Sequence, residues 1–251
     1  MNIQKQKFGV YIGTPLYSSE VHLAYLDSIV LLAKKLEKEG IPCLRQHVLN
    51  SSLITKARNI CISAFMNDTN LDYFLFIDAD IGFEASDVIK LMNHNKSLIA
   101  GVYPKKHLRW EDIQNCFFNH DPKSNKEIFE KTSQYAVIYN KEKNMIIKDE
   151  LIEVDRVGAG FMMIKRDLIK KLANKYPELI YNAGRGEKGY GFFESAIINK
   201  EHVSEDYAFC ERVKSIGEKI YIDPSIKLTH NGGNLTYYGD YKKHLQYINK
   251  K

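Results

Sequence analysis

The stretch "DYFLFIDADIGF", residues 72–83, decides the fold that the sequence predicts. Residues 73–77 are apolar without interruption, which is typical of a strand buried on both faces of a parallel sheet. Two carboxylates, Asp78 and Asp80, follow with Ala79 between them. Because residues i and i+2 of an extended chain point to the same side, these carboxylates repel each other unless a cation or a catalytic task uses both. Ligands of open α/β sheets bind beyond the carboxyl ends of the strands, so this stretch also marks the candidate site.

The segments around this strand alternate between strand and helix patterns. We expect Ser51 or Ser52 to cap the second helix and Gly40 to end the first. Strand–helix alternation at this spacing predicts an α/β domain with a Rossmann-like, mixed but mainly parallel sheet flanked by helices. The expected strands are 8–15, 42–49, 73–77 and 97–104, and the expected helices are 21–40, 51–68 and 84–95.

The second half of the chain begins with a polar segment of weak periodicity, residues 107–150, which we interpret as an insertion carrying an antiparallel hairpin of 135–140 and 144–149. No internal repeat, Walker motif or GxGxxG motif is present. The segments expected after the insertion are a strand–turn–strand–helix unit over 151–176, a glycine-rich loop over 184–195, a helix over 204–217 and two short strands within 219–233.

Composition limits the classes of function. With 251 residues, 44% of them hydrophobic and 27% charged, the chain fits one large globular domain. A net charge of +5 is too small to indicate nucleic acid, but it is compatible with an anionic substrate or a membrane surface. The absence of a signal-peptide pattern and of a long apolar run leads us to expect a cytoplasmic protein. Its cysteines are far apart and are expected to be reduced and mostly buried: Cys43, Cys61, Cys116 and Cys210.

Four motifs carry a resemblance to a known family. They are "FLFIDADIGFEASDVIKLM" (74–92), "AGVYPKK" (100–106), "VGAGFMMIKRDLIKKL" (157–172) and "SEDYAFCERVKSIGEKIYIDPSIKLTHNGG" (204–233). Their order resembles that of nucleotide-sugar glycosyltransferases of the GT-A fold, in the DxD-type branch of phages, large viruses and bacteria. The resemblance spans residues 8 to about 235 apart from the insertion.

The resemblance implies one GT-A-like catalytic domain over residues 1–251. Its expected parts are a nucleotide-sugar-binding half over 1–106, the insertion over 107–150, an acceptor and catalytic half over 151–235, and a basic, tyrosine-rich tail over 236–251.

The same resemblance implies a metal site made by Asp78, Asp80 and His230, with Mn²⁺ or Mg²⁺ held against the donor diphosphate. Carboxylate oxygens suit these hard cations, and a neutral imidazole is a plausible ligand for Mn²⁺. The alternative for the DxD motif is a turn in which Asp80 caps the next helix or the following turn at Gly82. For His230, the alternative is a histidine at a strand end with a water partner. The segment 231–233 is interpreted as a mobile loop that closes on the diphosphate.

By its position in the motif, Asp206 is expected to be the base that deprotonates the acceptor hydroxyl, which would invert the configuration at the anomeric carbon. Glu205 is expected to contact the acceptor. The alternative for both acids is a structural role, because carboxylates in a first helical turn complement the helix dipole.

Further residues are expected to bind the donor. Thr14 and Pro15 end the first strand, where the family cradles the base and ribose. Cationic or glycine residues at other strand and helix ends are candidates for contact with the diphosphate or the acceptor: Lys56, Arg58, Lys105, Lys106, Gly158 and Gly160. Ala79 completes the set as the middle residue of the DxD motif.

The resulting prediction is a metal-dependent, hexosyltransferase-like enzyme that moves a sugar from a UDP- or GDP-sugar to a hydroxyl of a glycan, protein or lipid-linked acceptor. The alternatives are an aspartate-nucleophile phosphohydrolase, a nucleotidyltransferase and a non-enzymatic sugar-binding module. We expect no nucleic-acid partner, and we expect weak association with a membrane surface and a homo-oligomer.

Overall fold

The computed structural model describes residues 7–120, 122–139, 147–148 and 151–249. The elements of the first part are β1 (Lys7–Pro15), α1 (Leu23–Lys38), β2 (Cys43–Val48), α2 (Ile54–Asp68), β3 (Leu71–Ile77), β4 (Ile81–Gly82), α3 (Ala85–His94), β5 (Leu98–Ala100), α4 (Trp110–His120) and α5 (Asn125–Thr132). Those that follow are β6 (Val137–Ile138), β7 (Ile147–Lys148), β8 (Leu151–Val154), β9 (Arg156–Val157), β10 (Phe161–Lys165), α6 (Arg166–Lys175), the 3₁₀ helix η1 (Pro177–Leu179), β11 (Ile180–Gly184), β12 (Glu187–Tyr190), β13 (Ala196–Ile198), β14 (Glu201–Val203), α7 (Glu205–Ser215), β15 (Ile220–Ile222), β16 (Thr229–Gly232), β17 (Leu235–Tyr238) and α8 (Tyr241–Ile248).

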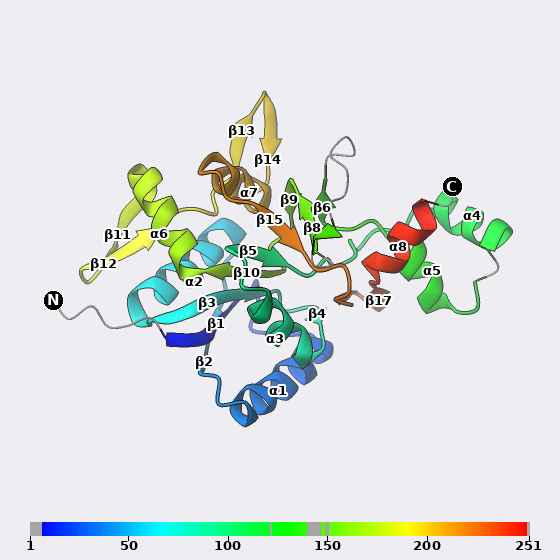
Figure 1. The fold of residues 1–251 in the computed structure, drawn as a ribbon, viewed down its shortest axis with the longest axis horizontal. Helices are drawn as coiled ribbons and strands as arrows, with labels where there is room; N and C mark the ends of the chain where they lie inside the picture. Colours follow the sequence, from blue (N-terminus) through cyan, green and yellow to red (C-terminus); the bar gives the residue numbers. More distant parts are fainter. Residues whose placement is uncertain (1–6, 121, 140–146, 149–150, 250–251) are drawn as a thin grey trace.

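An eight-stranded sheet forms the centre of the molecule, in the order β2-β1-β3-β10-β5-β15-β8-β7 (Figure 1). Strands β2, β1 and β3 are parallel to one another, and so are β5 and β15. Strand β10 is antiparallel to both of its neighbours, and β8 is antiparallel to β15 and β7. The sheet is therefore mixed, with β10 and β8 running against the direction of the other strands.

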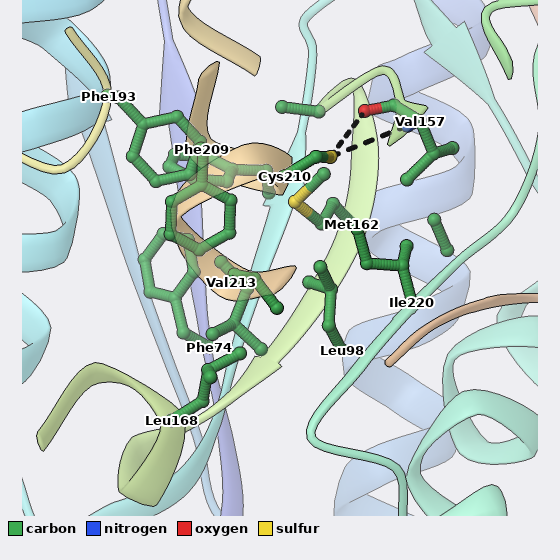
Figure 2. Packing of buried hydrophobic residues seen from close by; sticks show 14 of the residues in the cluster. Phe74, Leu98, Val157, Met162, Leu168, Phe193, Phe209, Cys210, Val213 and Ile220 are labelled. Atoms are coloured by element: carbon green, nitrogen blue, oxygen red, sulfur yellow. Dashed lines mark hydrogen bonds between the residues drawn. The ribbon is translucent and has the colours of Figure 1, made fainter. Parts of the chain in front are cut away.

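Helices cover both faces of this sheet, and β3 shows why its sequence is apolar throughout. Tyr73, Leu75 and Ile77 pack in a core with α1 and α3. Phe74 and Phe76 point the other way and pack with α2, α6 and α7, the face shown in Figure 2. Both sets of side chains are buried, as alternation on a two-sided strand requires. The predicted fold class, an α/β protein with a mixed, mainly parallel sheet flanked by helices, is confirmed.

The ends of the first two helices test the capping predictions. Gly40 follows the C-cap of α1 with a φ of +67°, as predicted. The predicted serine cap of α2 is wrong, because α2 begins at Ile54 with Leu53 as its N-cap and has no side-chain cap. Ser51 belongs to the loop after β2 and donates its hydroxyl to the Leu53 carbonyl at 3.0 Å.

The insertion differs from the prediction. Helices α4 and α5 occupy much of it, and α5 packs against α8 at one end of the molecule (right in Figure 1). The predicted hairpin is wrong where it is described: β6 pairs with β9, and β7 pairs with β8, while residues 140–146 and 149 lie outside the described residues. The signal for α5 was present, because Ser124 caps the helix by accepting from the Glu127 backbone N–H at 3.2 Å.

Two C-terminal segments are more regular than expected. The glycine-rich stretch 184–195 begins inside an antiparallel hairpin of β11 and β12, and residues 184–186 make its turn with positive φ. The tail contains β17 and α8, and α8 buries Tyr241, Leu245 and Tyr247. The four cysteines are free and three of them are buried, as expected. No helix in the described residues is long and apolar enough to cross a membrane.

Candidate functional site

The carboxyl ends of β1 and β3 open onto a cavity of ≈ 470 Å³. Pro15 and the loop after it line one wall, together with Ile54 at the start of α2. Residues 78–80 and His230 line the other wall. This position agrees with the general rule for α/β sheets, and the volume suits a small-molecule ligand. The first motif and the C-terminal histidine are thus brought together at the predicted edge of the sheet.

The backbone of Asp80 is fixed by a strand from the far end of the sequence. Strand β16 pairs with β4, which places His230 opposite Ile81. Asn231 donates both its backbone N–H and its side-chain amide to the Asp80 carbonyl, each at 2.9 Å. Asn231 is only 2% exposed, and residues 229–232 form a strand. The expectation of a mobile loop starting at Asn231 is therefore wrong.

The side chains of Asp80 and His230 face each other. Nε2 of His230 lies 3.4 Å from Oδ1 of Asp80, and Nδ1 lies 2.8 Å from the carbonyl oxygen of Pro104. Because a carbonyl can only accept, Nδ1 carries the proton. When the ring is neutral, its Nε2 lone pair faces the carboxylate, an arrangement that a cation between the two groups would stabilise; when the ring is protonated, Nε2–H faces the carboxylate instead. Histidine ligands of metals commonly donate their second ring N–H to a carbonyl in this way.

Lys106 is the second cationic neighbour of Asp80, and its ammonium contacts Oδ2 of that carboxylate. Burial alone would raise the pKa of Asp80, but the hydrogen bonds and positive charges of protonated His230 and of Lys106 outweigh this effect and lower it. Asp80 therefore remains ionised. The alternative in which Asp80 caps the next helix is wrong, because Glu84 is the N-cap of α3.

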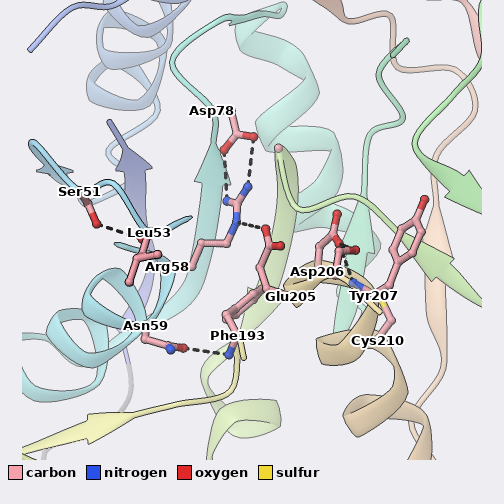
Figure 3. Close-up of polar contacts among 12 residues, drawn as sticks. Ser51, Leu53, Arg58, Asn59, Asp78, Phe193, Glu205, Asp206, Tyr207 and Cys210 are labelled. Atoms are coloured by element: carbon pink, nitrogen blue, oxygen red, sulfur yellow. Dashed lines mark hydrogen bonds and ion pairs between the residues drawn. The ribbon is translucent and has the colours of Figure 1, made fainter. Parts of the chain in front are cut away.

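Asp78 is bound by a buried arginine rather than facing Asp80. The guanidinium of Arg58, 5% exposed, contacts both carboxylate oxygens of Asp78 at 3.1 Å (Figure 3). Its Nε also donates to Oε1 of Glu205 at 3.3 Å, and the group stacks 4.9 Å from the centre of the Phe76 ring. Burial would lower the pKa of Arg58, but the two acids outweigh it and raise the pKa. Arg58 therefore links the end of β3 to the start of α7.

Asp206 is the second residue of α7 and lies beside this cluster (Figure 3). Ser204 is the N-cap, but its side chain makes no capping bond. Instead its hydroxyl contacts Oδ1 of Asp206, which also accepts from the Tyr207 backbone N–H at 2.8 Å. Burial, followed by the charges of Asp78 and Asp206, raises the pKa of Tyr103. Asp206 is thus oriented by local contacts. Its negative charge, like that of Asp78, raises the pKa of Tyr103.

The Gly158–Ala159–Gly160 turn lies beneath the site. A Cβ on Gly160 would lie 2.9 Å from Oδ2 of Asp78 and from the Tyr103 ring, and one on Gly158 would lie 2.3 Å from the Tyr103 hydroxyl. The Gly160 N–H donates to that hydroxyl at 3.2 Å, and the Gly160 carbonyl accepts from the Asp78 N–H at 2.9 Å. Both glycines are buried and make room for Asp78 and Tyr103.

Three other candidate residues do not line this cavity. The side chain of Thr14 is buried, and its hydroxyl lies 2.7 Å from that of Tyr25. Lys56 is exposed on α2, and Lys105 is exposed while its backbone N–H donates to the Gln134 carbonyl at 2.7 Å. Of the predicted base and ribose contacts, the structure places only Pro15 at the cavity.

In the described part of the chain, no three His, Cys, Asp or Glu side chains gather as a group that could hold a metal. Asp80 and His230 converge, whereas Asp78 faces Arg58. A carboxylate oxygen has more than one acceptor direction, so Asp78 can still reach a cation while Arg58 is bound. Asp80 and His230 are therefore the two convergent donors of the site, and both are of types that divalent cations bind.

Two residues that shape this site were not among those expected from the sequence. Tyr103 packs its ring against His230, with centroids 5.2 Å apart, and Asn231 holds the Asp80 backbone. Tyr103 stands in the quoted motif "AGVYPKK", and Asn231 directly follows His230. A polar amide inside a strand pattern was the available signal for Asn231.

No protein-family model and no curated protein matches this sequence. The structure is similar to the crystal structure of A197 from STIV, with a TM-score of 0.51 and 17% sequence identity, over 92% of this chain and 94% of A197. A glycosyltransferase involved in the glycosylation of the major capsid of PBCV-1 gives a TM-score of 0.31 at 10% identity, over 70% of this chain and 69% of that one. The 4-diphosphocytidyl-2C-methyl-D-erythritol synthase from Anaerococcus prevotii gives 0.34 at 11%, over 72% and 82%.

At this level of identity, the comparison with A197 shows a shared fold and says nothing about activity. The other two similarities are too low to carry an argument. The molecule is an α/β protein with a mixed central sheet and with a cavity at the carboxyl ends of β1 and β3 that is lined by Asp78, Asp80 and His230.

Proposed function

We propose that this chain is a metal-dependent glycosyltransferase that moves a sugar from a UDP- or GDP-sugar to a hydroxyl of a glycan, protein or lipid-linked acceptor. One observation supports this above the others. Oδ1 of Asp80 and Nε2 of His230 face each other at 3.4 Å, with the histidine tautomer set by the Pro104 carbonyl, at the mouth of a cavity of ≈ 470 Å³.

Asp80 and His230 would hold Mn²⁺ or Mg²⁺, with Asp78 as a further ligand. When bound, the cation supplies Lewis-acid stabilisation for charge on the leaving nucleoside diphosphate. Lys106 adds a cationic group at the same place. Pro15 offers an apolar surface to the base and ribose, and Thr14 supports the same strand end from the core.

The proton of the acceptor hydroxyl would go to Asp206. Its Oδ1 is oriented by the Ser204 hydroxyl and the Tyr207 backbone N–H, which leaves Oδ2 for the acceptor. A carboxylate base on the acceptor side supports a single displacement with inversion at the anomeric carbon. Glu205 is bonded to Arg58, so its role in the proposal is to position α7 against the end of β3.

The alternatives fit these observations less well. In an aspartate-nucleophile phosphohydrolase a Gly-Thr pair normally follows the DxD motif, whereas Ile81, Gly82 and Phe83 follow it here. A nucleotidyltransferase of similar fold would be expected to carry basic residues in the loop after β1, and residues 16–22 contain no Arg or Lys. A sugar-binding module without activity would show no metal-dependent turnover.

The test is a screen of UDP- and GDP-sugars with MnCl₂ and no acceptor, in which release of free UDP or GDP is measured. We expect slow release from at least one donor, loss of release with excess EDTA, and recovery when Mn²⁺ is restored. Full turnover in excess EDTA would contradict the metal-dependent mechanism.

A matched pair of variants assigns the effect to the site. Asp80→Ala should abolish Mn²⁺-dependent binding of UDP or GDP, as measured by calorimetry. Lys123→Ala, an exposed change in the insertion, should leave it unaltered. Equal affinity of Asp80→Ala and the parent would remove Asp80 from the proposed metal site.

A further inference from the structure

The side chain of Lys106 passes over Gly232, where the missing Cβ leaves room for it. A Cβ on Gly232 would lie 2.6 Å from Cδ and 3.1 Å from Cε of Lys106, so the lysine stem lies flat on the backbone of β16. Beyond Gly232, the ammonium of Lys106 contacts Oδ2 of Asp80. The lysine is therefore directed onto the carboxylate by the strand that also carries His230.

Lys106 shares Asp80 with the proposed cation. Oδ2 of Asp80 contacts the ammonium and Oδ1 faces Nε2 of His230, so both oxygens have a partner. The side chains of Lys106 and Asp80 are about equally accessible, at 35% and 34%. A divalent cation drawn to this carboxylate would lie within a few ångströms of the ammonium, and the two positive charges would repel.

We propose that the ammonium of Lys106 neutralises Asp80 when no metal is bound. When a divalent cation binds to Asp80, the ammonium leaves this carboxylate and pairs with the diphosphate of the donor. This inference rests on the proposed function and adds a specific role for one residue. The ammonium on its flexible stem can leave Asp80 and stay within reach of a diphosphate held at the same carboxylate. Lysine binds phosphate as a point charge, so the pairing needs no fixed orientation.

A coupling between the two ligands follows. A divalent cation alone must compete with the ammonium for Asp80, so it binds weakly. A cation that arrives with a nucleoside diphosphate gives the displaced ammonium a new anionic partner. Lys106 therefore opposes the cation alone and favours the cation together with the diphosphate, and by linkage each ligand strengthens the binding of the other.

The decisive variant is Lys106→Met, which keeps an unbranched stem on Gly232 and removes the charge. Titration with MnCl₂ alone, with free Mn²⁺ measured by electron paramagnetic resonance, should show binding about tenfold tighter than in the parent. Calorimetry with UDP and with GDP in saturating MnCl₂ should show binding about tenfold weaker for the nucleotide that the parent prefers. The two effects have opposite signs.

A second variant moves the charge without deleting it. Gly232→Ala places a methyl group against the flexible stem of Lys106 and should shift the ammonium off Asp80. It should also tighten the binding of Mn²⁺ alone. Lys219→Ala is the control for net charge. Lys219 pairs with Glu153 at 2.7 Å and directly precedes β15, so it lies at the amino ends of the parallel strands, away from the cavity at their carboxyl ends. It should change neither titration.

Weaker or unchanged binding of Mn²⁺ alone to Lys106→Met would overturn the inference, as would nucleotide affinity equal to that of the parent. Both results are read against a parent protein that binds UDP or GDP in a Mn²⁺-dependent way. A parent that binds neither nucleotide with Mn²⁺ would refute the proposed function, and the inference would fall with it. Normal parental binding with unchanged Lys106→Met would refute the inference alone.

Discussion

Arg58 gives the sharpest test of how the site is held together. Replacing it by methionine keeps an apolar stem against Phe76 but leaves the carboxylates of Asp78 and Glu205 without their shared cation. The side chains are 5%, 25% and 14% exposed for Arg58, Asp78 and Glu205. Removing one partner of a buried ion pair typically costs about 3–5 kcal/mol. Since Asp78 can regain some water, we expect a loss of about 3 kcal/mol in the free energy of unfolding.

For a chain of this size, that loss corresponds to a fall of about 6–12 °C in Tm. Urea unfolding gives the free energy, and a thermal scan gives Tm. The matched control is Arg156→Met. Arg156 contacts Glu211 at 2.6 Å with both side chains about a quarter exposed, and Glu211 keeps Lys214 as a partner at 2.9 Å. We expect this control to cost about 1 kcal/mol or less.

A double-mutant cycle separates the charge from the packing of the arginine. Glu205→Gln in the parent weakens the bond to Arg58 and should destabilise. In the Arg58→Met background, the same change removes an uncompensated carboxylate and should stabilise, with a coupling of about 1–2 kcal/mol. A cost of Arg58→Met below 1 kcal/mol, or an additive cycle, would refute the description of this cluster as a buried, charge-compensated link.

Three further predictions concern single residues. Asp206→Asn keeps an oxygen that can accept from the Tyr207 N–H, so UDP or GDP binding should stay near the parental value while transfer falls by about 10²–10⁴-fold; retention of anomeric configuration by NMR would contradict this. Burial raises the pKa of Asp87 from 3.8 to about 6. The native state therefore binds the carboxyl proton more tightly than the unfolded chain does, and the free energy of unfolding falls as the pH rises from 3.8 to about 6. Asp87→Asn should therefore be more stable than the parent by about 2 kcal/mol above pH 7 and by little near pH 4, and an equal gain at both values in urea unfolding would argue against the buried charge. Gly160→Ala would crowd Asp78 and the Tyr103 ring, so we expect a loss of about 1–3 kcal/mol and weaker nucleotide binding, and unchanged calorimetry would contradict the role of this glycine.

Much of the fold could be predicted because local patterns agreed with the tertiary structure. The apolar run before Asp78 is buried on both faces, and the surrounding alternation of strands and helices follows the expected order. The insertion could not be predicted in the same way. Strand β6 pairs with β9 rather than with its neighbour in sequence, and a two-residue strand carries too little periodicity to indicate its partner.

The place of the DxD motif at the carboxyl edge of the sheet could be predicted, but the contacts of its side chains could not. The position of Asp78 and Asp80 after a buried strand was sufficient to locate the cavity wall. The orientation of each carboxylate depends on its cationic partner, Arg58 or Lys106, and these partners belong to other segments of the chain. A motif fixes the spacing along the chain, whereas the pairing of charges is decided by rotamers that only the packed structure defines.

The position of β10 has a consequence for how the chain is made. This strand lies between β3 and β5, yet it is synthesised long after both of them. Until residues 161–165 leave the ribosome, the facing edges of β3 and β5 have no partner and can pair with other chains. Closing the sheet then requires a contact between distant segments, which slows folding. A fragment that ends before Phe161 should aggregate, and the nascent chain should depend on chaperones until its central strand arrives.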